Sequence, residues 1–158
     1  MKGKKYTDPI DGKGFRSFLP YGYENPRENV LSPSTLSLER HRLLWLYLQS
    51  ETNFFSAPLK VLHFAPEQPF YRRFRRLKNL DYTTTDLNSP LADVKADICH
   101  LPFENNSFDF VMAFASIYML NFGGVLNSLR EIQRVGKGRS YVTLGAYRTK
   151  EEKELYDL

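Results

Sequence analysis

The sequence predicts an α/β fold built on a mostly parallel sheet of about five strands with flanking helices. Two observations predict it. From residue 58 onward, short apolar segments alternate with segments of helical spacing, as in parallel βαβ units with right-handed crossovers. The first segment, Leu59–Ala65, is almost continuously apolar, which is typical of a strand buried on both faces of a parallel sheet.

The remaining strands follow from the same pattern. Pro66 ends the first strand, because proline has no N–H to donate. The other strands are expected at 80–85, 93–97, 108–115 and 140–147.

Helices are expected before and between these strands. Apolar residues share one face of a first helix, whose start Ser34 or Thr35 can cap; they are Leu36, Leu43, Leu44, Tyr47 and Leu48. A second helix is expected over 67–78, where Phe70, Phe74 and Leu77 recur at helical spacing. Val125, Leu129 and Ile132 mark a third, which Gly136 and Gly138 can terminate. Thr149 and Glu152 form a capping-box pattern for a last helix.

Residues 1–33 differ in composition from the rest of the chain. They are rich in Gly, Pro and Asn and carry aromatic residues at Phe15, Phe18, Tyr21 and Tyr23. We interpret them as an irregular N-terminal arm partly fixed by its aromatic side chains. Residues 34–158 are then expected to form a single domain.

The composition excludes several classes of protein. With 158 residues, 42% hydrophobic and 25% charged, the chain is neither a disordered tail, a collagen-like fibre nor a disulfide scaffold. Its single cysteine, Cys99, cannot form an internal disulfide. No stretch has the length of a membrane span, and no signal peptide is recognisable, so a cytoplasmic location is expected.

Charge is unevenly distributed along the chain. Residues 1–79 hold 14 Lys/Arg and 7 Asp/Glu, whereas residues 80–158 hold 8 and 11. A basic half can bind acidic partners, including nucleic acid. We favour the simpler interpretation for the cluster Arg72–Arg76, a solvated helix face.

Chemistry-bearing residues follow the ends of three predicted strands. In an open parallel sheet, ligands bind at the carboxyl ends of the strands. The turn 63–68 follows the first strand, Asp86 ends the second, and Asp97-Ile98 ends the third. Asp86 lies about 20 residues beyond the first turn, where a carboxylate binds ribose hydroxyls in nucleoside-binding sheets.

The motif D-I-x-x-L-P-F beginning at Asp97, followed by S-F-D-x-V from Ser107, resembles class I S-adenosylmethionine-dependent methyltransferases. The similarity covers Leu36–Leu158, and V-L-H-x-A-P-E in place of a glycine-rich loop is typical of a bacterial subgroup. It implies a Rossmann-like, doubly wound sheet of strand order 3-2-1-4-5 and the cofactor S-adenosyl-L-methionine.

The resemblance also implies which residues contact the cofactor. The first turn would approach the methionine end, Asp86 the ribose, Asp97 and Ile98 the adenine, and Ala115 and Ser116 the reacting methyl group. The predicted cofactor-binding residues are Phe64, Ala65, Pro66, Glu67, Asp86, Leu87, Asp97, Ile98 and Ala115. No catalytic residue is assigned; Tyr118, Tyr21 and Tyr23 are candidates on the substrate side only.

Three departures from the family pattern are visible. The first turn has no G-x-G, the segment 31–42 lacks the zinc-ribbon cysteines of related sequences, and the chain stops after the fifth of the usual seven strands. We therefore expect no bound metal and a truncated sheet. An uncovered fifth strand is an edge that can pair with another chain, so a homodimer is predicted.

Several site residues have a simpler alternative. Asp86 is also suited to a helix cap or turn, Asp97 to a strand end, and Glu67 to the first turn of a helix. His63 is expected to be a hydrogen-bonded core residue and His100 an exposed loop residue.

Three functions remain open at this point. The leading one is methyl transfer by direct displacement to a small-molecule or unknown acceptor. The second is a catalytically idle module that binds S-adenosylmethionine or is purely structural. The third, less favoured, is a basic nucleic-acid-binding module. No membrane partner is expected.

Overall fold

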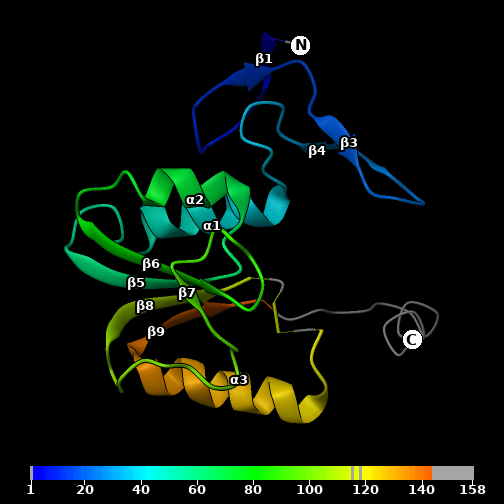
Figure 1. Ribbon diagram of the computed structural model, residues 1–158. Helices are drawn as coiled ribbons and strands as arrows, with labels where there is room; N and C mark the ends of the chain where they lie inside the picture. Colours follow the sequence, from blue (N-terminus) through cyan, green and yellow to red (C-terminus); the bar gives the residue numbers. More distant parts are fainter. Residues whose placement is uncertain (1, 115, 118, 144–158) are drawn as a thin grey trace. The chain divides into compact units, whose positions relative to one another are not determined.

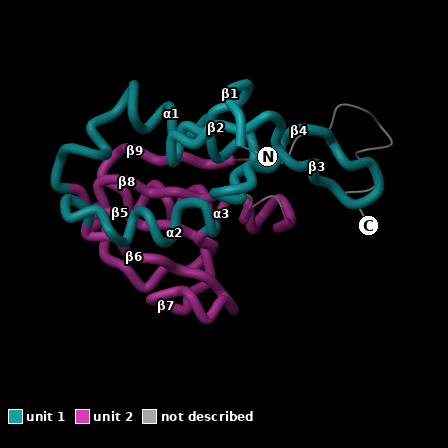
Figure 2. The backbone as a smooth tube through the Cα atoms, turned by 90° about the horizontal axis from the view of Figure 1, so that it is seen from above, with its two compact units in different colours: residues 1–58, 67–80 teal, residues 59–66, 81–158 magenta. Residues whose placement is uncertain are grey.

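The computed structural model describes residues 2–114, 116–117 and 119–143. Contacts divide the chain into two compact units, one formed by residues 1–58 and 67–80 and the other by residues 59–66 and 81 onward. Figure 2 shows the two units in different colours. Among the described residues, no helix is long and apolar enough to cross a membrane.

The second unit holds the predicted five-stranded sheet. Its strands lie in the order β7-β6-β5-β8-β9, which confirms the predicted order 3-2-1-4-5 (Figure 2). β5 pairs with β8, β8 with β9 and β6 with β7, all in parallel. The strand bounds are β5 Leu59–Phe64, β6 Leu80–Asp86, β7 Val94–Lys95, β8 Phe108–Ala113 and β9 Gly136–Val142.

The centre of the sheet is the β5–β8 pair. Val61 lies opposite Phe110 and Phe64 opposite Ala113, and the last four residues of β5 are 0–3% exposed. One face of the sheet packs against α3 (Phe122–Val135), where Ile132 and Val135 join a buried cluster that includes Leu62 and Val111. Figure 1 shows α3 running along this face. The continuous apolar pattern of the strands is explained by this burial.

The predicted fifth strand, 140–147, begins earlier in the structure. Gly136 directly follows α3, takes an extended conformation and donates its N–H to the carbonyl of Ile132. A Cβ at Gly136 would lie 3.0 Å from that carbonyl oxygen and 3.3 Å from Val111. Gly136 therefore ends the helix as predicted but also starts β9, without an intervening loop. Residues 144–147 and the expected last helix lie outside the described residues.

In the first unit, the N-terminal segment is more regular than predicted. Two antiparallel pairs, β1–β2 and β3–β4, occupy the region expected to be irregular. Phe15 and Phe18 are buried as expected, whereas Tyr21 and Tyr23 are exposed. The elements of this unit are β1 Lys2–Thr7, β2 Gly14–Phe15, β3 Leu19–Tyr21, β4 Arg27–Leu31, α1 Glu39–Ser50 and α2 Gln68–Phe74.

The predicted cap of the first helix is wrong. α1 begins after Leu38, and neither Ser34 nor Thr35 caps it. Thr35 instead donates its hydroxyl to Asp8, which is 0% exposed, and the Ser37 hydroxyl lies 3.3 Å from the same carboxylate oxygen. Leu38 donates its backbone N–H to Nδ1 of His41 at 2.8 Å, so a histidine takes the place of the expected cap.

The two helices of this unit share an aromatic core. Phe54, Phe70 and Phe74 are 0% exposed, and the Trp45 ring stacks parallel to Phe74 at 6.2 Å between ring centroids. The second helix is shorter than the predicted 67–78, but Phe70 and Phe74 face the core as expected. Packing in one core explains the aromatic residues of this region.

An arginine on α3 holds the loop that follows β7. Arg134 donates hydrogen bonds to the carbonyls of Leu101 and Phe103 and to both carboxylate oxygens of Glu131. Glu131 in turn accepts the N–H of Leu101 at 2.7 Å. The hydrogen bonds from Arg134, with a further one from Leu101, lower the pKa of Glu131 from 4.5 to about 2. Loop 101–103 is thus tied to α3 by a charged network.

Replacing Glu131 by Gln tests this network through the pH dependence of stability. A carboxyl group whose pKa is lowered by folding stabilises the fold above its unfolded pKa, and this contribution is lost as the pH falls toward the folded pKa. We expect Glu131→Gln to be less stable than the wild type at pH 7, with the difference shrinking from pH 4.5 toward pH 2. Urea unfolding across this range measures it.

Glu104→Gln in the same loop is the matched control, since the side chain of Glu104 is exposed. Its stability should follow the wild type at every pH. A Glu131→Gln deficit that stays constant down to pH 3 would contradict the assignment of the lowered pKa.

Candidate functional site

A cavity of about 230 Å³ lies at the carboxyl ends of β5, β6 and β7, within the sheet unit. It also reaches the segment that follows β8. Its lining residues are Phe64, Ala65, Thr85, Asp86, Leu87, Ala96, Asp97, Ile98, Ser116 and Leu120. The site therefore forms where the topology of an open parallel sheet directs ligands.

Six of the nine predicted cofactor-binding residues line this cavity: Phe64, Ala65, Asp86, Leu87, Asp97 and Ile98. Pro66 is not among the lining residues. Glu67 belongs to the other compact unit, and Ala115 lies outside the described residues, as does Tyr118. The structure thus brings three separate stretches of sequence to one cavity, and ligand contacts by these residues stay a prediction.

The first turn is tight although it lacks glycine. Ala65 takes a left-handed conformation with φ +45°, which is costly for a residue that carries a Cβ. Its N–H donates to the carbonyl of Thr85 at 2.9 Å, so the carboxyl-terminal ends of β5 and β6 are joined at the edge of the cavity. The small side chain of alanine takes the role that glycine has in the G-x-G pattern.

Asp86 shapes the loop that follows β6. Its Oδ1 accepts the backbone N–H groups of Asn88 at 2.8 Å and Ser89 at 2.7 Å. Within the described part of the chain, Oδ2 accepts no hydrogen bond. Oδ1 therefore stabilises the turn, as the simpler interpretation of Asp86 expected. Oδ2 can still accept a hydrogen bond from a ligand.

Asp97 has a similar arrangement. Its Oδ1 accepts the N–H of Cys99 at 2.9 Å, and its carbonyl accepts the N–H of His100. Oδ2 lies 3.8 Å from Nδ1 of His100, whose side chain is 81% exposed. Both predicted carboxylates thus brace their own loops while lining the cavity, and His100 is the exposed loop residue that was expected.

Glu67 is bound by two basic side chains of α1. Its carboxylate lies 2.8 Å from Arg40 and 2.8 Å from Nε2 of His41. Burial opposes ionisation, but these two partners outweigh it and keep the pKa of Glu67 below its ordinary value. Because Nδ1 of His41 accepts a backbone N–H, the proton lies on Nε2 and faces Glu67. This contact gives Glu67 a structural role that its sequence position did not indicate.

His63 is a core residue, as expected. It is 0% exposed, and its Nδ1 lies 2.7 Å from the hydroxyl of Tyr82 on the neighbouring strand. The imidazole also packs edge-on against Phe114. Its Nδ1 is thus hydrogen-bonded inside the sheet.

Three lining residues were not predicted: Thr85, Ala96 and Leu120. Thr85 and Ala96 directly precede the predicted acids Asp86 and Asp97, so their proximity was the available signal. Leu120 had none, because the segment after β8 has no regular pattern. Across the residues described here, no group of three or more His, Cys, Asp or Glu is placed to hold a metal ion.

The fold and site define an α/β protein with a cavity lined by two carboxylates at the switch in strand order. Residues 60–144, more than half of the chain, match the family model described as "Methyltransferase domain". The chain belongs to this family, and the predicted resemblance to class I S-adenosylmethionine-dependent methyltransferases is confirmed at the level of family and fold.

Solved structures show the same fold at low sequence identity. A proposed S-adenosyl-L-methionine-dependent methyltransferase from Methanococcus maripaludis matches with a TM-score of 0.51 and 16% identity over 73% of this chain and 59% of its own. The PH0226 protein from Pyrococcus horikoshii matches with a TM-score of 0.50 and 18% identity over 66% of this chain and 56% of its own.

The cyclase SpnF also matches, with a TM-score of 0.50 and 17% identity over 82% of this chain and 51% of its own. The chain thus spans between half and three fifths of the length of these proteins. A comparison with curated proteins finds no match.

Ala65 provides a test of the first turn. Replacing it by Val should lower the free energy of unfolding by more than about 1 kcal/mol, because a β-branched residue at positive φ is strained. Replacing it by Gly should leave stability within about 1 kcal/mol of the wild type, since relief of strain offsets the entropy of glycine. Denaturant unfolding of both variants measures the difference. Equal stability of Ala65→Val and the wild type would show that the turn is not constrained.

Proposed function

We propose that the sheet unit binds S-adenosylmethionine in this cavity and holds it for methyl transfer to an acceptor. The observation that carries the proposal is the convergence of Asp86 and Asp97 on one cavity in a chain of the methyltransferase domain family. The predicted ligand contacts of the lining residues form part of this proposal.

The chemistry of the cavity fits the nucleoside end of this cofactor. Ribose hydroxyls and the adenine amino group are hydrogen-bond donors, and the carboxylates of Asp86 and Asp97 accept hydrogen bonds. Phe64, Ile98 and Leu120 supply apolar wall for the planar base. Two hydroxyl oxygens of lining residues, those of Thr85 and Ser116, are buried and have no hydrogen-bond partner among the described residues. The volume of about 230 Å³ is below the roughly 300–1,000 Å³ of typical ligand pockets, and so suits the nucleoside part better than the whole molecule.

Methyl transfer places modest demands on the protein. Bound S-adenosylmethionine supplies a methyl group activated by its attachment to a positively charged sulfur. The chain's own residues bind and orient: Asp86 and Asp97 fix the nucleoside, and the apolar walls exclude water. Catalysis of this kind depends mainly on proximity and orientation, so no nucleophilic side chain is required.

Cofactor binding and methyl transfer need separate tests, because fold does not determine activity. SpnF is a cyclase with the same fold, and the solved relatives are longer than this chain. The alternative is a module that binds the cofactor without transferring its methyl group. Cofactor binding together with no transfer to any member of a broad acceptor panel would favour this alternative.

Calorimetry with S-adenosylmethionine and S-adenosylhomocysteine tests cofactor binding. We expect saturable binding of both, and Asp86→Asn should weaken it by about tenfold or more, since a hydrogen bond to a charged group is lost. Asparagine keeps an oxygen at the Oδ1 position, so the N–H groups of Asn88 and Ser89 retain their acceptor.

Asp81→Asn is the matched control for this experiment. Asp81 lies on the same strand, its side chain is 69% exposed, and its ion pair with Lys60 is 4.0 Å long. The affinity of Asp81→Asn for both ligands should equal that of the wild type. Failure of the wild type to bind either ligand at high protein concentration would refute the proposed function, and unchanged affinity in Asp86→Asn would remove Asp86 from the site.

We also propose that the chain self-associates through β9. Among the described strands β9 lies at the end of the sheet and pairs only with β8. An open edge presents backbone N–H and C=O groups to another strand. Sedimentation equilibrium should show a dimer whose population rises with concentration; a monomer at all concentrations would contradict this.

A further inference from the structure

Thr85 carries a buried hydroxyl group that the fold does not use. The residue is 0% exposed, and its Oγ1 has no hydrogen-bond partner in the described part of the chain. An unsatisfied buried polar group is destabilising and is rare in folded proteins. The hydroxyl of Thr85 therefore requires an explanation other than stability.

The neighbouring residue shows what a structural threonine looks like on this strand. Thr84 is also 0% exposed, but its Oγ1 lies 2.8 Å from Oδ2 of Asp93 and 3.3 Å from the carbonyl of Leu91. The side chains of Thr84 and Thr85 point to opposite faces of the sheet, because successive residues of a strand alternate. One hydroxyl is therefore fully used by the fold and the next is not.

Thr85 is held firmly at the wall of the cavity. Its carbonyl accepts the N–H of Ala65, and its Cα pairs with that of Val94 on β7. Valine has the same branched shape and would fill the same space without a polar atom. The residue that lines the cavity nevertheless carries a hydroxyl, which can both donate and accept a hydrogen bond.

We propose that Thr85 is a specificity-determining residue whose hydroxyl hydrogen-bonds the nucleoside part of the bound cofactor. This inference rests on the proposed function, because it assumes that the cavity takes an adenine nucleoside. It adds a third polar contact to the two proposed for Asp86 and Asp97. The residue that makes it directly precedes Asp86 at the end of β6.

The experiment compares Thr85→Val with Thr84→Val. Calorimetry uses two probes, S-adenosylhomocysteine and 5′-methylthioadenosine, which share the nucleoside but not the amino-acid part. Thr85→Val should lower the affinity for both probes by a similar factor of roughly three to ten, the effect of one lost hydrogen bond. Thr85→Ser, which keeps the hydroxyl, should restore most of the affinity.

Thermal unfolding without ligand provides the second readout. Thr85→Val should unfold at the same temperature as the wild type or higher, because it removes an unsatisfied polar atom. Thr84→Val should unfold at a lower temperature, because it leaves Asp93 without a partner hydroxyl. This opposite response of two adjacent threonines separates a ligand-binding hydroxyl from a structural one.

Each adverse outcome has a distinct meaning. Wild-type affinity in Thr85→Val, or a loss of stability as large as that of Thr84→Val, overturns the inference and leaves the proposed function intact. A lower affinity for S-adenosylhomocysteine alone also overturns the inference, because the contact of Thr85 would then lie outside the nucleoside. If the wild type binds neither probe, the proposed function fails and this inference fails with it.

Discussion

The site depends on one backbone constraint, the end of β5 at Phe64. Ala65 turns the chain with a positive φ, and Pro66 has no N–H with which to continue the strand. The N–H of Ala65 is directed to Thr85 instead of to a fifth position of the β5–β8 pairing. The central strand therefore stops at the level where β6 also ends, and the cavity forms at that point.

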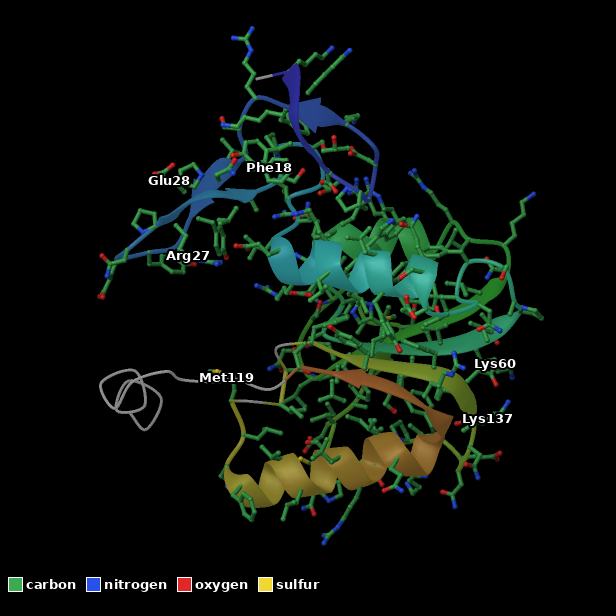
Figure 3. The ribbon with its side chains drawn as sticks, turned by 180° about the vertical axis from the view of Figure 1, so that it is seen from behind. Phe18, Arg27, Glu28, Lys60, Met119 and Lys137 are labelled. Carbon is green, nitrogen blue, oxygen red and sulfur yellow. The ribbon has the colours of Figure 1, made fainter. Side chains whose placement is uncertain are left out.

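Most of the motif that identifies the family has a structural role. Leu101 and Phe103 are held through their carbonyls by Arg134, and Phe103 packs edge-on against Phe108. Asp109 accepts the backbone N–H of Lys60 on β5 and the ammonium group of Lys137 on β9, and the contact with Lys137 contributes most to lowering its pKa. Figure 3 shows Lys60 and Lys137 near one another at this end of the sheet. Most residues of the motif thus connect β5, β8, β9 and the loop after β7. Its first two residues, Asp97 and Ile98, line the cavity.

The sequence predicted the sheet well because each strand is specified locally by its buried apolar run. It predicted six cavity residues because strand ends in a parallel sheet converge by topology alone. The contacts that the sequence did not indicate join residues far apart in the chain: Thr35 binds Asp8, 27 residues away, and Glu67 binds Arg40, also 27 residues away. Such partners leave no periodic signal. The unused hydroxyl of Thr85 could not be inferred either, because its distinction from Thr84 exists only once the partners of both are known.

The direct passage from α3 into β9 at Gly136 has a mechanical consequence. Most crossover connections end in a loop that absorbs small shifts of the helix. Here a single residue belongs to the cap of one element and the first ladder position of the next, opposite Phe108. A rotation or translation of α3 must therefore move the start of β9 with it. The same helix carries Arg134, so we expect the loop after β7, the helix and the last described strand to move together.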